Sequence, residues 1–200
     1  MSDGFFYWYS EPHDKRGVER LLHALEAYGV HLAHPTSHAI TTITDGPDSW
    51  GEQLPVERGE LVELLTLTDR PEVNFQLWLN EETDMFTRFR RLGAGRVVIE
   101  FGLDGMSPAE QERAIRAASH AVSADRDRTW GLVIDRRGLT EETDWDRVMQ
   151  GGQVLLPRLP DLLGVRPEVA TAHSQLSATR GEMEPPLVVF RGDGSETVDR

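Results

Sequence analysis

"DMFTRFRRLGAGRVVIEFGL" (residues 84–103) is the stretch that decides the fold, because it fits one β-hairpin register well. Gly93-Ala94-Gly95 supply a three-residue loop, which needs a residue with positive φ, and glycine adopts this conformation without strain. Pairing Leu92 with Arg96 gathers the apolar residues on one face, whereas a slip of one residue would bring charge into that face. The stretch therefore predicts two antiparallel strands with one buried side.

This register assigns each cross-strand pair to a face of the sheet. The predicted core pairs are Arg91/Val97, Phe89/Ile99, Thr87/Phe101 and Met85/Leu103, and the predicted outward pairs are Arg90/Val98 and Arg88/Glu100. The preceding segment "VNFQLWL" (73–79) alternates with the two-residue period of a strand. Its apolar residues Val73, Phe75, Leu77 and Leu79 would continue the core face.

The outward face of these three strands is the predicted partner-binding site. Arginine and aromatic side chains are enriched in binding hot spots, because a planar cation and a rigid ring bind at low entropic cost. The alternative is that the Pro-rich C-terminal segment covers the face and that Arg88 and Glu100 form an ordinary cross-strand pair. The candidate residues are Asn74, Gln76, Trp78, Phe86, Arg88 and Arg90.

Outward from the hairpin, the chain alternates strand and helix signals. "FFYWY" (5–9) lacks alternation and predicts a central strand that is buried on both faces. A helix is expected between the Asp14 cap and Gly29, and another over 107–125, where Ser107 and Glu110 form a capping box. "ELVELLTLT" (60–68) is ambiguous between helix and strand, and its Leu-Thr-Leu-Thr end favours a strand.

These elements predict an α+β fold in one domain, with a mainly antiparallel sheet, a meander, and helices packed on one face. Residues 1–150 would form the α+β domain. Residues 151–200 would form a Pro-rich C-terminal segment that wraps the domain and ends in a partly irregular tail, with "LVVF" (187–190) as an edge strand. The layout of meander, helix and returning strand resembles that of small bacterial immunity-type proteins, which implies a protein partner.

Composition limits the partners. The chain has 200 residues, with 34 acidic against 21 basic residues and a net charge of −13. Such a field repels phosphate backbones and anionic membranes, so we expect neither nucleic acid nor membrane as a partner, but a protein or a small anionic ligand. The absence of cysteine excludes disulfides and thiolate chemistry, and we expect a cytoplasmic protein without a cofactor.

"HLAHPTSH" (31–38) supplies the candidate metal ligands His31, His34 and His38. Gly29 and Pro35 prevent a helix through this stretch, so the spacing cannot show whether the three rings converge. A metal-dependent enzyme that uses these ligands, with Glu11 or Asp14 as base, is the alternative function. A solvated loop is the competing interpretation of the same residues.

Motifs for the common catalytic sites are absent from the sequence. There is no G-x-S-x-G, no G-x-x-x-x-G-K-[ST] and no G-x-G-x-x-G. The sequence therefore favours a non-enzymatic, acidic binding or regulatory protein over an enzyme, and it leaves the partner and the oligomeric state open.

Overall fold

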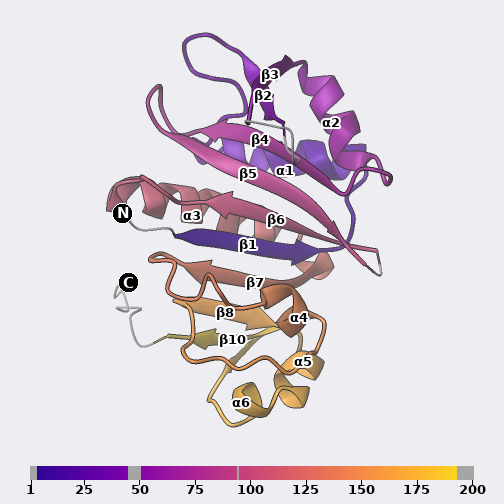
Figure 1. Ribbon diagram of the computed structural model, residues 1–200, viewed down its shortest axis with the longest axis vertical. Coiled ribbons are helices and arrows are strands. Elements are labelled where there is room, and N and C mark those ends of the chain that lie inside the picture. Colours follow the sequence, from indigo (N-terminus) through magenta and orange to yellow (C-terminus); the bar gives the residue numbers. More distant parts are fainter. Residues whose placement is uncertain (1–3, 45–50, 94, 193–200) are drawn as a thin grey trace.

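A computed structural model describes residues 4–44, 51–93 and 95–192. In these ranges ten strands form one antiparallel sheet, ordered β3-β2-β4-β5-β6-β1-β7-β8-β10-β9, which runs the length of the molecule (Figure 1). The predicted α+β class and mainly antiparallel sheet are confirmed. The strands are β1 (Phe5–Ser10), β2 (Ile40–Ile43), β3 (Gln53–Val56), β4 (Glu72–Trp78), β5 (Asp84–Leu92), β6 (Arg96–Gly102), β7 (Thr129–Asp135), β8 (Leu162–Val165), β9 (Glu182–Glu184) and β10 (Leu187–Arg191).

The helices form two groups that lie on opposite faces of the sheet (Figure 1). The three longer helices cover one face of the sheet, which includes the apolar side of the hairpin. Three short helices and the loop after α4 cover the other face, over the half of the sheet that contains β7, β8 and β10. The long helices are α1 (Lys15–Glu26), α2 (Arg58–Thr66) and α3 (Pro108–Ala124), and the short ones are α4 (Trp145–Met149), α5 (Pro167–Ala172) and α6 (Ser174–Ser177).

The hairpin register is confirmed. Leu92 pairs with Arg96 and Arg88 with Glu100. Gly95 has the positive φ, 68°, that the loop requires, while Ala94 lies outside the described residues. β6 ends at Gly102, so the ladder stops before the predicted pair of Met85 with Leu103, although both side chains are buried.

β1 is central and buried on both sides, as predicted. Phe6 and Trp8 belong to the core beneath α1 and α3. Phe5 and Tyr9, on the alternate positions, belong to the core beneath the short helices. The two cores therefore share this strand, which pairs with β6 on one side and β7 on the other.

The predicted strand at residues 60–68 is wrong, because this segment is the helix α2 followed by two residues of loop. Leu61, Val62 and Leu65 are buried, and their spacing places them on one side of a helix. The Leu-Thr-Leu-Thr pattern that suggested a strand falls across the helix end. There the Thr66 hydroxyl donates to the Glu63 carbonyl within the last turn, at 2.8 Å.

The C-terminal segment extends the sheet. β8, β10 and β9 add to it beyond β7, and β10 lies one position in from the edge, where the sequence predicted an edge strand. Four strand spacings, about 19 Å, separate β5 from β8, so the strands that this segment adds lie away from β4 and β5. The division at residue 150 stays a prediction, and the end of the predicted tail, residues 193–200, lies outside the described residues.

None of the helices in the described ranges has the length and apolarity that a bilayer crossing requires.

Candidate functional site: the β4–β5 face

The six residues predicted as a partner site lie together on one face of the sheet, which we call the β4–β5 face. Asn74 pairs with Arg88 and Gln76 with Phe86 in the β4–β5 ladder, and residues that pair across two strands share a face. Trp78 and Arg90 follow at the two ends of the same rows. The structure thus brings together Asn74, Gln76, Trp78, Phe86, Arg88 and Arg90, and their role in binding stays a prediction.

A row of buried polar atoms without partners runs along β4. Asn74 and Gln76 are each only 5% exposed, and their amide nitrogens donate to Glu72 Oε1 at 3.0 Å and Asp84 Oδ2 at 2.9 Å. The amide oxygens of both residues and the indole nitrogen of Trp78 are buried without a hydrogen-bond partner among the described residues. Each such atom costs about 1–3 kcal/mol of the free energy of folding.

Phe86 and Arg88 form the accessible part of the face. Phe86 is 38% exposed and the Arg88 side chain is 40% exposed, with its guanidinium carbon 5.8 Å from the centre of the Phe86 ring. Arg88 Nε lies 3.1 Å from Glu72 Oε1 as an ion pair, although the angle does not make a hydrogen bond. A partner that reaches the row on β4 would contact these two side chains first.

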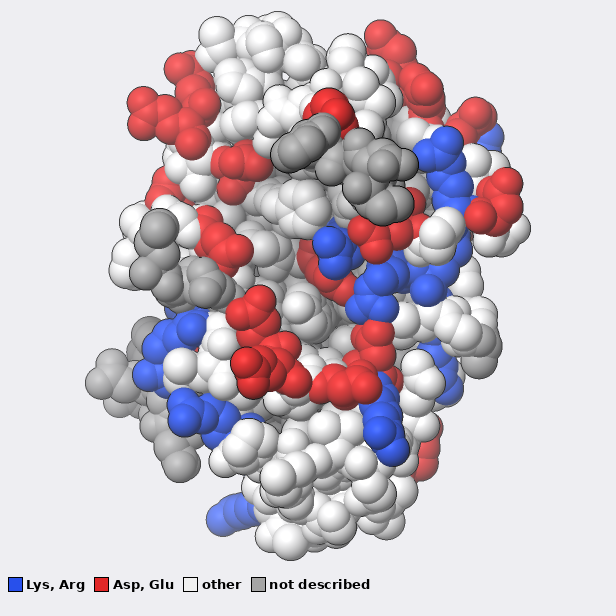
Figure 2. All heavy atoms as spheres, in the orientation of Figure 1, with Lys and Arg blue, Asp and Glu red and all other residues white. Residues whose placement is uncertain are grey.

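Arg90 has a structural role, because it joins β5 to α4. Its guanidinium donates to Glu100 Oε1 at 2.5 and 2.9 Å and to Asp146 Oδ2 at 2.5 Å. Glu100 is thus bound more closely by Arg90, diagonally, than by its predicted partner Arg88, whose Nη1 lies 3.7 Å away. Figure 2 shows positive and negative side chains next to one another over β5 and β6 on this side of the molecule.

The pKa values of this cluster show which charge states the fold prefers. Although burial lowers the pKa of the Arg90 guanidinium, its hydrogen bonds to Asp146 and Glu100 raise that pKa above the usual value. Burial raises the pKa of Tyr9, as does Asp146, whose Oδ1 accepts from the Tyr9 hydroxyl at 2.9 Å. The cluster therefore favours a charged arginine and a neutral tyrosine.

The three histidines of residues 31–38 do not gather around one point. The backbone of His31 bonds to that of Trp78 in both directions, at 2.8 and 2.7 Å, so this residue ties the loop to the end of β4. The His34 ring meets the Trp78 ring edge-on, 4.4 Å between centroids, and its Nδ1 accepts two backbone N–H groups of the following turn at 3.1 and 3.2 Å. His38 lies at the end of that turn with φ 59°.

A metal site finds no support elsewhere in the described ranges either, because no three His, Asp or Glu side chains there are placed to hold an ion. Asp14, a candidate base, caps α1 by accepting from the Gly17 N–H at 2.7 Å. Glu11, the other candidate, lies 3.6 Å from Arg128. The residues of the alternative enzyme hypothesis therefore have separate surroundings.

A Ser-His-Asp arrangement that sequence reasoning missed lies beside β1. The Ser10 hydroxyl is 3.0 Å from His13 Nε2, and His13 Nδ1 is 3.4 Å from Asp125 Oδ2. The types and order match a hydrolase triad. Ser10 is completely buried, however, and the adjoining cavity of about 30 Å³ holds little more than a water molecule, so no substrate reaches this hydroxyl.

No protein-family model, curated protein or solved structure matches this chain. The chemistry of the β4–β5 face is therefore the basis for assigning a function. The two-residue period of β4 and β5 was sufficient to find that face. Nothing in the sequence indicated that α4 would contribute Asp146 to its border, because the two segments are far apart in the chain.

Proposed function

We propose that this protein is a non-enzymatic, cytoplasmic binding protein that takes a protein partner on the β4–β5 face. The observation that carries the proposal is the row of buried, unpartnered polar atoms along β4 next to exposed Phe86 and Arg88. A fold tolerates such atoms when another molecule satisfies them, and a rigid ring beside an arginine is the usual composition of a binding hot spot.

The chemistry of the face favours a basic partner. The unpartnered atoms of Asn74 and Gln76 are hydrogen-bond acceptors, and Glu72 and Asp84, which hold their amide nitrogens, are carboxylates. Lysine, arginine or amide N–H groups of a partner would satisfy these acceptors. A net charge of −13 would speed the encounter with a basic protein surface and slow the encounter with an acidic one.

Differential capture tests the proposal. The wild type, the double variant Phe86→Ala/Arg88→Ala and the control Leu155→Ala/Arg180→Ala are immobilised and exposed to a lysate of the source cells. The control removes the same kinds of exposed side chain from the C-terminal segment. A basic protein should be retained by the wild type and the control and lost by the double variant. When the captured partner is purified and titrated against each protein, the double variant should bind it with a Kd at least a hundredfold higher than that of the wild type.

The proposal fails if no protein distinguishes the double variant from the control. Thermal melting of all three proteins checks that they are folded. Gln76→Met gives a second test, since it removes one unpartnered oxygen with little change of volume. This variant should change the free energy of unfolding by less than about 1 kcal/mol, because a buried unsatisfied oxygen is lost together with a hydrogen bond, yet it should weaken partner binding at least tenfold.

A further inference from the structure

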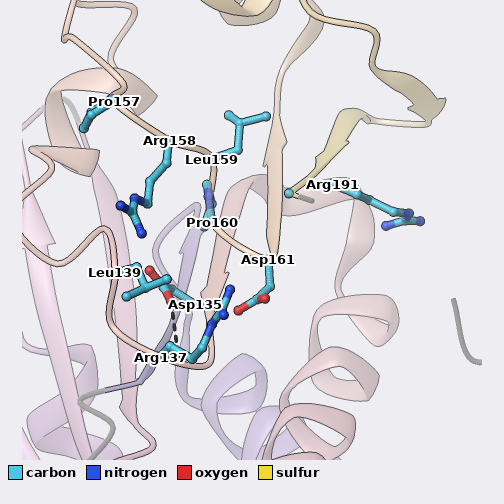
Figure 3. A pocket seen from close by; sticks show the side chains of 10 residues that line it. Asp135, Arg137, Leu139, Pro157, Arg158, Leu159, Pro160, Asp161 and Arg191 are labelled. Carbon is cyan, nitrogen blue, oxygen red and sulfur yellow. Dashed lines mark hydrogen bonds between the residues drawn. The ribbon is translucent and has the colours of Figure 1, made fainter. Parts of the chain in front are cut away.

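A separate pocket opens at the other end of the sheet, where the end of β7, the loop at 157–161 and the end of β10 meet (Figure 3). Its volume is about 400 Å³, within the range of about 300–1,000 Å³ of small-molecule sites. Arg137 and Arg158 line it from different segments, and Leu139, Pro157 and Leu159 supply apolar walls. In Figure 3, Arg137 and Arg158 extend into the same hollow, whereas Arg191 points away.

Of the three arginines that line the pocket, two form no ion pair within the described residues. Neither Arg137 nor Arg158 makes an ion pair or a side-chain hydrogen bond there, whereas Arg191 lies 2.8 Å from Glu184. The chain carries 34 acidic residues against 21 basic ones, so two arginines without an ion pair in one pocket run against its overall charge. Two guanidinium groups that face one space repel each other unless an anion lies between them.

The two carboxylates of the pocket form no ion pair with these arginines and accept hydrogen bonds that hold the shape of the turn. Asp135 is buried, and its Oδ2 accepts from the backbone N–H and the hydroxyl of Thr140, both at 2.7 Å. Its Oδ1 accepts from the Arg137 backbone N–H at 3.1 Å. Asp161 Oδ2 accepts from the Arg136 backbone N–H at 2.7 Å. These bonds fix the turn from which the Arg137 side chain extends.

We propose that this pocket binds a small organic anion. Its phosphate or carboxylate group lies between Arg137 and Arg158, since a planar guanidinium can bind two oxygens of such a group at once. The organic part of the anion lies against Leu139, Pro157 and Leu159. This site is independent of the β4–β5 face, from which β6 and β1 separate it in the sheet.

Calorimetric titration with inorganic phosphate, phenyl phosphate and benzoate tests the site and distinguishes its two oxyanion sources. The titrations are made on the full chain. At least one aromatic probe should bind saturably and more tightly than inorganic phosphate. Phenyl phosphate as the tighter aromatic probe indicates a phosphate ligand, and benzoate a carboxylate ligand.

Single substitutions then locate the binding. Arg137→Ala and Arg158→Ala should each raise the dissociation constant at least tenfold, while Arg180→Ala, which removes an exposed arginine outside the pocket, should leave it unchanged. Arg158→Lys should lie between, because a lysine keeps the charge and loses the two-pronged contact. The proposal is overturned if no probe binds, or if the binding is insensitive to both alanine substitutions.

Discussion

Replacing His13 by glutamine should remove much of the acid sensitivity of the folded state. The His13 ring is buried between the Ser10 hydroxyl and Asp125, at 3.0 and 3.4 Å. Burial lowers the pKa of this histidine from 6.5 to about 4 and outweighs the opposite effect of Asp125. The surrounding charges are Asp125, Arg128, Arg20 and Asp14.

The sign and size of the effect follow from proton linkage. The unfolded chain takes up a proton on His13 as the pH falls through 6.5, whereas the folded chain does so only near pH 4. The folded state is therefore fully stable with respect to this group above pH 6.5 and loses stability as the pH falls towards 4. This difference in pKa lowers the free energy of unfolding by about 3 kcal/mol between pH 7.5 and pH 4. Most of this loss has occurred by pH 4.5.

Urea unfolding at pH 7.5, 6.5, 5.5 and 4.5 measures the effect. His13→Gln should be less stable than the wild type at pH 7.5, because hydrogen bonds are altered, but its stability should fall less with pH, so that the two curves converge or cross. His23→Gln is the control, since His23 is largely exposed on α1, and it should follow the wild type. Parallel curves for His13→Gln and the wild type from pH 7.5 to 4.5 would refute the reasoning.

Three further predictions test the fold. Arg90→Met should cost about 1–2 kcal/mol of unfolding free energy at pH 7 by urea unfolding, because it leaves two neighbouring carboxylates without their cation. An unchanged free energy of unfolding would contradict this. Leu61→Ala should lower the free energy of unfolding in urea by about 2–4 kcal/mol, and Leu67→Ala should lower it by less than about 0.5 kcal/mol, because only Leu61 is buried. Similar losses for both variants would contradict this and favour a strand, which would place both residues on the same face. The Glu110 carboxyl should titrate by NMR with a pKa of about 2, lowered by hydrogen bonds from the helix cap and from the Thr83 hydroxyl, and Thr83→Val should raise that pKa.

The hairpin could be predicted in register because its information is local. The glycines fix the loop, and the next residues on each side must then face each other, so the alternation of charge and apolar residues selects one pairing. The helix over 58–66 could not be separated from a strand in the same way. Its apolar residues are few, and the choice depended on packing against α1, which the segment itself does not encode.

The candidate sites follow the same division. Strand periodicity placed Asn74, Gln76 and Trp78 on one face, because only neighbouring strands were involved. The hydrogen bond from Arg90 to Asp146 joins β5 to α4, which are 56 residues apart in the sequence. The Arg137–Arg158 pocket likewise needs three segments that meet only after the sheet has formed. Residue spacing in the sequence does not predict contacts between segments that are so far apart in the chain.

The central place of β1 determines when this protein can fold during its synthesis. Phe5 pairs with Gly102 on one side and with Asp135 on the other, so this strand waits for partners that come much later in the chain. At roughly 5–20 residues per second, the wait for β6 lasts about 5–19 seconds, during which the most aromatic segment of the chain has no strand beside it. Newly made chains should therefore depend on a chaperone over this interval, and a circular permutant that begins at α3 should fold with less delay during synthesis.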